Sequence, residues 1–183
     1  TDGDMDKAME FLRENGLAKA AKKAGRIAAE GIVDTYVSDD GKTASIVEVN
    51  SETDFVAKNE VFRTFVAGVA AQAASTSAAD VEGFLAEKWS EDTSMTVNEK
   101  LAGMIATIGE NMNIRRFAKV LAEDGMVVSY IHAGGKIGVL VKAVTDNTGA
   151  EVKECLKNVA MQVAAMSPKY VSADDVSEDY KKS

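Results

Sequence analysis

The chain contains one segment twice. Residues 30–72 and 124–166 align without a gap, residue 30 with residue 124. The identical pairs are Gly31 with Gly125, Val33 with Val127, Tyr36 with Tyr130, Gly41-Lys42 with Gly135-Lys136, Val47 with Val141, and residues 69–71 with residues 163–165. A match at one fixed spacing is typical of a duplicated structural unit, so the sequence predicts two related units.

The two copies differ most directly after their second predicted strand. Copy one has Thr53-Asp54-Phe55, whereas copy two has Asn147-Thr148-Gly149, a sequence typical of a plain turn. Because related units share a fold, we look for function in the residues that only one of them carries.

Hydrophobic periodicity and capping signals predict an α+β fold with two duplicated subdomains, each a small antiparallel sheet covered by helices. Turn signals favour strands at 27–37 and 43–50, and again at 126–132 and 136–145. A further strand is expected at 113–121. Helices are expected at 4–15 (ending at Gly16), 17–24, 54–74, 79–89 (ending near Trp89), 97–108 (after a capping box that begins at Thr96) and 147–166.

These elements suggest four segments. Residues 1–25 are interpreted as the end of an N-terminal helical domain and a linker, 26–112 as the first subdomain, 113–170 as the second, and 171–183 as the start of a C-terminal helix. The chain begins with Thr1 and stops soon after a helix start at Ser172, so both ends are expected to be truncated.

The composition narrows the class of protein. Lys and Arg total 21 against 29 Asp and Glu, a net charge of −8, which argues against general nucleic-acid binding. No apolar run approaches the ~20 residues that span a bilayer, and no secretory signal is present. A single cysteine, Cys155, suits a reducing cytoplasm. We therefore expect a cytoplasmic protein without membrane contact.

Catalytic and metal-binding patterns are absent from the sequence. His132 is the only histidine, and nothing local places it beside Cys155. No clustered metal ligands occur, and the glycine-rich stretch 133–138 lacks Walker spacing and favours a hairpin turn. No cofactor is predicted. A basic stripe, Lys19, Lys22, Lys23 and Arg26, is interpreted as a solvated face in preference to a phosphate or partner contact.

Two candidates for an exposed contact remain open at this point. Phe55 precedes Phe62 by seven residues, which suits a core position on one helical stripe, yet copy two carries Gly149 there, so the fold does not require an aromatic. Ile108-Gly109 fits an ordinary helix end as well as a partner contact.

Four ordered blocks nevertheless make a specific pattern. They are residues 18–31, residues 50–59, residues 108–116, and Tyr130-Ile131-His132 with residues 135–140. Together they closely resemble the bacterial translation elongation factor Ts family, over essentially the whole chain.

The resemblance implies a guanine nucleotide exchange factor for elongation factor Tu, not an enzyme. It implies a core of two related subdomains behind a three-helix domain similar to ubiquitin-associated domains, of which residues 1–15 resemble the last helix. It also implies that Asp54 and Phe55 intrude between helices of the partner's GTPase domain, that Thr53 and Val56 beside them also bind the partner, and that Ile108, Gly109 and His132 are further contacts.

Taken without the resemblance, the residues leave two alternatives. One is a structural interaction module, for instance a scaffold that forms a homodimer. The other is an enzyme that uses His132 and Cys155.

Overall fold

The computed structural model describes residues 3–181, so positions 1–2 and 182–183 of the expected terminal segments lie outside it. The elements in chain order are α1 (Met5–Lys23), β1 (Glu30–Val37), β2 (Thr43–Ser51), α2 (Asp54–Ala57), α3 (Glu60–Ser75), α4 (Val81–Ala86), β3 (Lys88–Trp89), β4 (Asp92–Thr96), α5 (Val97–Ile108), β5 (Met112–Leu121), β6 (Gly125–His132), β7 (Ile137–Val144), α6 (Ala150–Met166), a 3-10 turn (Ala173–Asp175) and α7 (Glu178–Lys181).

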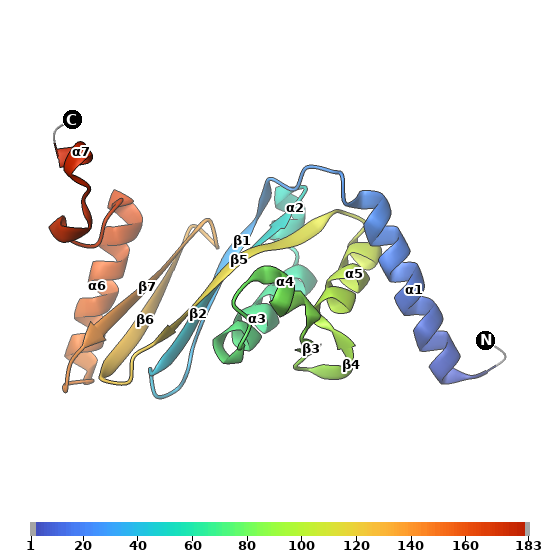
Figure 1. Cartoon of the computed structure of the whole chain (residues 1–183), viewed down its shortest axis with the longest axis horizontal. Helices are drawn as coiled ribbons and strands as arrows, with labels where there is room; N and C mark the ends of the chain where they lie inside the picture. Colours follow the sequence, from blue (N-terminus) through green and yellow to red (C-terminus); the bar gives the residue numbers. More distant parts are fainter. Residues whose placement is uncertain (1–2, 182–183) are drawn as a thin grey trace.

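The elements form layers across the molecule (Figure 1). Helix α6 covers one face of the β6–β7 pair, with Val139, Ala160 and Ala164 buried between them. The sheet β1-β2-β5 follows, and then α3, α4 and α5, which enclose the largest core. Helix α1 lies outermost against α5 (Figure 1). Small antiparallel sheets covered by helices confirm the predicted α+β class.

The duplication is confirmed down to strand register. Gly31 pairs with Asn50 in copy one, and its counterpart Gly125 pairs with Val144 in copy two. A Cβ atom on Gly31 would clash with the carbonyl oxygen of Val49, and one on Gly125 would clash with that of Ala143. Both positions therefore need glycine for the same reason, the close approach of the paired strand.

The two copies also dock on each other symmetrically. The backbone N–H of Val33 donates to the carbonyl of Gly135 at 2.7 Å, and the N–H of Val127, its counterpart, donates to Gly41, the counterpart of Gly135, at 2.9 Å. Gly41 and Gly135 both adopt positive φ, +68° and +103°, so each turn presents its carbonyl to the other copy. The repeat thus builds an internal pseudo-twofold contact.

Strand β5 differs from the expectation. The boundary at 112/113 assigned it to the second unit, but it pairs with β2 from Ser51↔Met112 to Thr43↔Leu121. Over the described residues, the first sheet therefore has three strands and the sheet of copy two has two. The physical reason is that β5 precedes the repeat at 124 and has no equivalent in copy one, so it is free to pair along the open edge of β2.

The expected break at Gly16 was wrong. Helix α1 runs unbroken from Met5 to Lys23, and Gly16 is buried within it. A Cβ atom on Gly16 would lie 3.8 Å from the backbone of Ala102 and Gly103 in α5. The glycine therefore marks a close approach of two helices rather than a helix end.

The expected helix at 54–74 is interrupted. Helix α2 ends at Ala57, and Asn59 begins α3 because its side-chain oxygen accepts hydrogen bonds from the N–H groups of Val61 (2.9 Å) and Phe62 (3.2 Å). Copy two has Lys153 at the matching position, and α6 is continuous there. The side-chain cap competes with helix propagation and divides the segment.

The helix expected at 79–89 is also shorter than predicted. Helix α4 ends at Ala86, and Lys88–Trp89 instead pairs with β4. Trp89 is fully buried, and a Cβ atom on Gly68 of α3 would lie 2.8 Å from its ring. Burial of this ring holds the segment as a strand. The predicted capping box of α5 is confirmed, with Thr96 and Glu99 each bonding the other's backbone.

Candidate functional site

Helix α2 places Phe55 in solvent. Thr53 begins the helix, and its hydroxyl oxygen accepts from the N–H of Val56 at 3.4 Å. Val56 and Ala57 are buried, whereas Phe55 is 82% exposed. The break at Asn59 separates Phe55 from the stripe of Phe62, which is why the seven-residue spacing does not carry Phe55 into the core. The core interpretation of Phe55 was therefore wrong.

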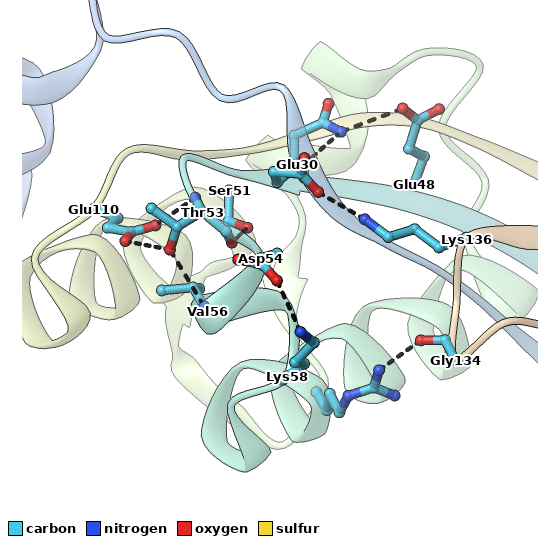
Figure 2. Close-up of polar contacts among 12 residues, drawn as sticks. Glu30, Glu48, Ser51, Thr53, Asp54, Val56, Lys58, Glu110, Gly134 and Lys136 are labelled. Atoms are coloured by element: carbon cyan, nitrogen blue, oxygen red, sulfur yellow. Dashed lines mark hydrogen bonds and ion pairs between the residues drawn. The ribbon is translucent and has the colours of Figure 1, made fainter.

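Asp54 forms an ion pair within the same short segment. The ammonium of Lys58 lies 2.8 Å from the Asp54 carboxylate, one helical turn away. This hydrogen bond, with the positive charge that makes it, lowers the pKa of Asp54 below its ordinary value. The Asp54 carboxylate therefore points at the ammonium of Lys58 within the same short segment (Figure 2).

The end of α5 lies next to α2. Gly109 adopts the left-handed conformation (φ +89°) and its N–H caps α5 by donating to the carbonyl of Ile105. Ile108 is half-buried against the main core, and Gly109 is exposed. The Glu110 carboxylate accepts two hydrogen bonds from Thr53, from the backbone N–H at 3.0 Å and from the hydroxyl at 2.7 Å (Figure 2). The segment Ile108–Glu110 is thereby fixed beside the start of α2.

The β6–β7 turn approaches α2 from the second copy. Arg63 of α3 donates to the carbonyl of Gly134 at 2.5 Å, and Lys136 forms an ion pair with Glu30 at 2.6 Å (Figure 2). A groove separates this turn from α2. Its lining residues are Glu30, Ile32, Asp54, Ala57, Lys58, Arg63, Ala133, Gly134 and Lys136.

His132 stands at the last position of β6, before this turn. Its ring is exposed, and Nδ1 lies 2.9 Å from the Tyr130 hydroxyl. Among residues 3–181 no hydrogen bond joins His132 to Cys155, which is exposed on α6. The enzyme alternative therefore gains no geometric support.

The structure thus brings together three separate segments that the sequence singled out. Residues 53–56 lie between the α5 end on one side and the β6–β7 turn on the other. Glu110 joins the α5 end to Thr53, and two bonds hold the β6–β7 turn to the first copy, from Arg63 to Gly134 and from Lys136 to Glu30. Sequence reasoning assigned none of the four side chains a role. Glu30, Glu110 and Lys136 lie inside the blocks that resemble the family, which is the sequence signal they carried, whereas Arg63 lies outside these blocks.

Two other kinds of site were sought. Within the described part of the chain, no group of three or more His, Cys, Asp or Glu side chains is arranged to hold a metal ion. None of the helices between residues 3 and 181 has the length and apolar character needed to cross a membrane.

Comparison with known proteins decides the family. Residues 52–183, which include α2, the α5 end and the β6–β7 turn, match the family described as Elongation factor TS. The chain belongs to the elongation factor Ts family.

Relatives named Elongation factor Ts are similar along almost the whole chain. The protein of Clostridium botulinum (strain Eklund 17B / Type B) is 52% identical over 98% of this chain and 58% of its own length. That of Clostridioides difficile (strain 630) is 54% identical over the same shares. That of Clostridium kluyveri (strain NBRC 12016) is 53% identical over 95% of this chain and 57% of its own length. The chain therefore spans somewhat more than half the length of these elongation factor Ts proteins.

Proposed function

We propose that this chain binds elongation factor Tu in the cytoplasm and promotes the release of bound GDP. The observation that carries the proposal is Phe55, a large apolar side chain 82% exposed on a one-turn helix, where the duplicated unit has Gly149. Exposed aromatic side chains on a defined support are favoured anchors at protein interfaces.

The neighbouring residues suit a contact surface around that anchor. Asp54 presents an ionised carboxylate, Gly109 presents exposed backbone, and His132 presents an exposed ring. Thr53 and Val56 fix helix α2, which carries this surface, because Thr53 caps the helix and Val56 is buried. Ile108, which precedes Gly109, is half-buried against the main core.

The proposed mechanism follows from linkage. A protein that binds nucleotide-free elongation factor Tu more tightly than the GDP-bound form must weaken GDP binding by the same factor. No covalent bond changes, so the chain acts as an exchange factor and not as an enzyme. We propose that α1 is the last helix of an N-terminal helical domain. This helix packs on the rest of the chain through α5.

The test is release of mant-GDP from purified elongation factor Tu with increasing amounts of this chain. The release rate is expected to rise and saturate. Phe55→Ala is expected to remove most of the acceleration, whereas Phe11→Ala, which truncates an exposed phenylalanine on α1, is the matched control and leaves it in place. An unchanged release rate at high micromolar wild-type chain would contradict the proposal.

A further inference from the structure

The ladder between β2 and β5 ends just before the candidate site. The last registered pair is Ser51 with Met112. Continued by one and two positions, that register sets Glu52 opposite Asn111 and Thr53 opposite Glu110. After Ser51 the chain leaves the sheet to begin α2, and before Met112 it arrives from the end of α5. The ladder hydrogen bonds therefore stop at this pair.

Two glutamates replace the missing ladder bonds. The Glu52 carboxylate accepts from the N–H of Asn111 at 2.6 Å, and the Glu110 carboxylate accepts from the N–H of Thr53 at 3.0 Å. Each segment thus supplies the acceptor for the other segment's unpaired N–H group. Hydrogen bonds to a carboxylate acceptor are stronger than those between neutral groups. The two hydrogen bonds therefore hold the two segments together beyond the end of the ladder.

The two glutamates differ in what they hold. Glu52 bonds the backbone of Asn111 and pairs with Arg26 at 3.6 Å, and neither partner belongs to α2. Glu110 bonds both donors of Thr53, and the Thr53 hydroxyl in turn accepts from the N–H of Val56. One unbroken series of contacts therefore runs from Glu110 through Thr53 into α2.

Phe55 depends on this series for its direction. The side chain is almost fully exposed, so packing does not orient it, and α2 has only four residues. A helix this short is not stable by propagation of its own hydrogen bonds and needs its cap and its buried side chains. The rotation of α2, and with it the direction of Phe55, is set by the cap at Thr53 and the burial of Val56 and Ala57.

Copy two shows the turn without this arrangement. Within residues 3–181 its sheet consists of β6 and β7 alone, so no described residue takes the place that Glu110 has in copy one. Asn147, the counterpart of Thr53, closes its own turn by accepting from the N–H of Gly149 at 2.9 Å. The fold therefore does not require an outside carboxylate at this junction, and only the copy with the exposed aromatic has one.

We infer that Glu110 is a positioning residue for nucleotide exchange. Its carboxylate fixes Thr53 and so holds α2 in the rotation that presents Phe55 and Asp54 to the partner. This inference rests on the proposed exchange function. Glu110 acts through Thr53 rather than by touching the partner.

The test compares Glu110→Ala with Glu110→Gln in mant-GDP release. Loss of a charged acceptor weakens exchange, and Glu110→Ala is expected to lower the concentration-dependent release rate about 10- to 100-fold. Glu110→Gln keeps one acceptor oxygen, enough for one of the two Thr53 donors, and is expected to recover part of the loss. Glu99→Ala, which removes the equivalent carboxylate–backbone bond at the start of α5, is the control and keeps wild-type exchange.

A second measurement separates positioning from direct contact. In a Phe55→Ala background, Glu110→Ala is expected to cause little further loss, because residues that act through one another are not additive. An equal loss in both backgrounds would overturn the inference, as would wild-type exchange by Glu110→Ala.

A third measurement does not use the partner. Amide hydrogen exchange at Thr53 and Val56 in the free chain is expected to accelerate in Glu110→Ala and stay slow in Glu99→Ala. If the wild-type chain fails to release GDP, the exchange function fails by itself, and these amide rates still decide whether Glu110 orders α2. Unchanged protection of both amides in Glu110→Ala would refute the inference.

Discussion

Phe55 and Phe62 show how one backbone detail separates two phenylalanines. Both lie in a segment that reads as a single helix, seven residues apart. The Asn59 cap ends one helix and begins another between them, so Phe62 is completely buried and Phe55 is exposed. The amphipathic pattern places both side chains on one buried face. The Asn59 cap separates them, so only Phe62 is in the core.

Truncation of the two phenylalanines is expected to give opposite results. Phe55→Ala should change the free energy of unfolding by less than ~0.5 kcal/mol, as surface substitutions do, and should weaken partner binding by roughly 2–4 kcal/mol. Phe62→Ala should cost about 3–5 kcal/mol of stability through lost transfer energy and a cavity. Urea unfolding and a binding titration on both variants provide the measurements. A large fall in the unfolding midpoint for Phe55→Ala would count against its role as an anchor.

The Asp54–Lys58 pair gives a prediction in pH. The folded-state pKa of Asp54 is lowered by Lys58, so the pair contributes stability that is present above the unfolded-state pKa and is lost as the pH falls through the lower folded-state pKa. Lys58→Met should return the carboxyl pKa towards its ordinary value. Carbon-detected NMR titration of the Asp54 carboxyl in the wild-type protein and in Lys58→Met measures the change. An identical Asp54 titration in both proteins would contradict the assignment.

In helix α1, tertiary packing overrides a local signal for the end of a helix. Gly16 reads locally as a stop, but the helix continues because its central turn packs against α5 at Ala102 and Gly103. Tertiary packing routinely overrides the local weakness of a glycine in a helix. The basic stripe expected on the short helix 17–24 therefore lies largely in the last turns of one long helix, where Lys22 and Lys23 also complement the helix dipole, and Arg26 follows the end of that helix.

Substitution of Gly16 distinguishes a continuous helix from two short ones. Gly16→Ala should stabilise the protein by about 0.5–1 kcal/mol, since Ala is the better helix former and its Cβ meets α5 at an ordinary contact distance. Gly16→Leu should destabilise it, because the larger side chain forces α1 away from α5. Thermal unfolding of the two variants measures the effect. Destabilisation by alanine would mean that position 16 needs a conformation only glycine adopts.

At the scale of the whole molecule, the second copy reaches the site through the pseudo-twofold contact. Gly138 of β7 packs against the first sheet so closely that a Cβ atom would lie 2.5 Å from a methyl group of Val33. Its repeat counterpart, Ala44, is fully buried at the related position. Small residues at these two positions let the copies approach, and this approach carries the β6–β7 turn to α2.

Overpacking this contact should weaken both stability and exchange. Gly138→Leu is expected to cost about 1–3 kcal/mol, because the added side chain must displace Val33 and Ile46. It should also lower exchange by shifting His132 and Lys136 relative to α2. Lys142→Leu, which places the same side chain at an exposed position of β7, is the control and should do neither. Equal stability of the two variants in urea would show that the copies do not need this close approach.

Much of the fold and part of the site could be predicted from local signals. The repeat predicted two hairpin units, and their shared register followed because the same glycines are needed at the same close approaches. The capping box at Thr96 and the left-handed Gly109 were readable because caps depend on residues within one turn of each other. The blocks around Phe55, Ile108 and His132 indicated the family for the same reason, since short contiguous segments carry them.

The sequence by itself therefore determined the duplication, the strand pairs within each copy, the two ends of α5 and the family. Only the tertiary structure decided that β5 completes the first sheet, that α1 is unbroken, that Phe55 faces water and that Glu110 holds Thr53. Periodicity and capping act between neighbours in the chain and can be read there. By contrast, the pairing of β5 with β2 and the contact of Glu110 with Thr53 join residues more than fifty positions apart in the chain. Such contacts depend on how the elements pack, so they cannot be read from neighbouring residues.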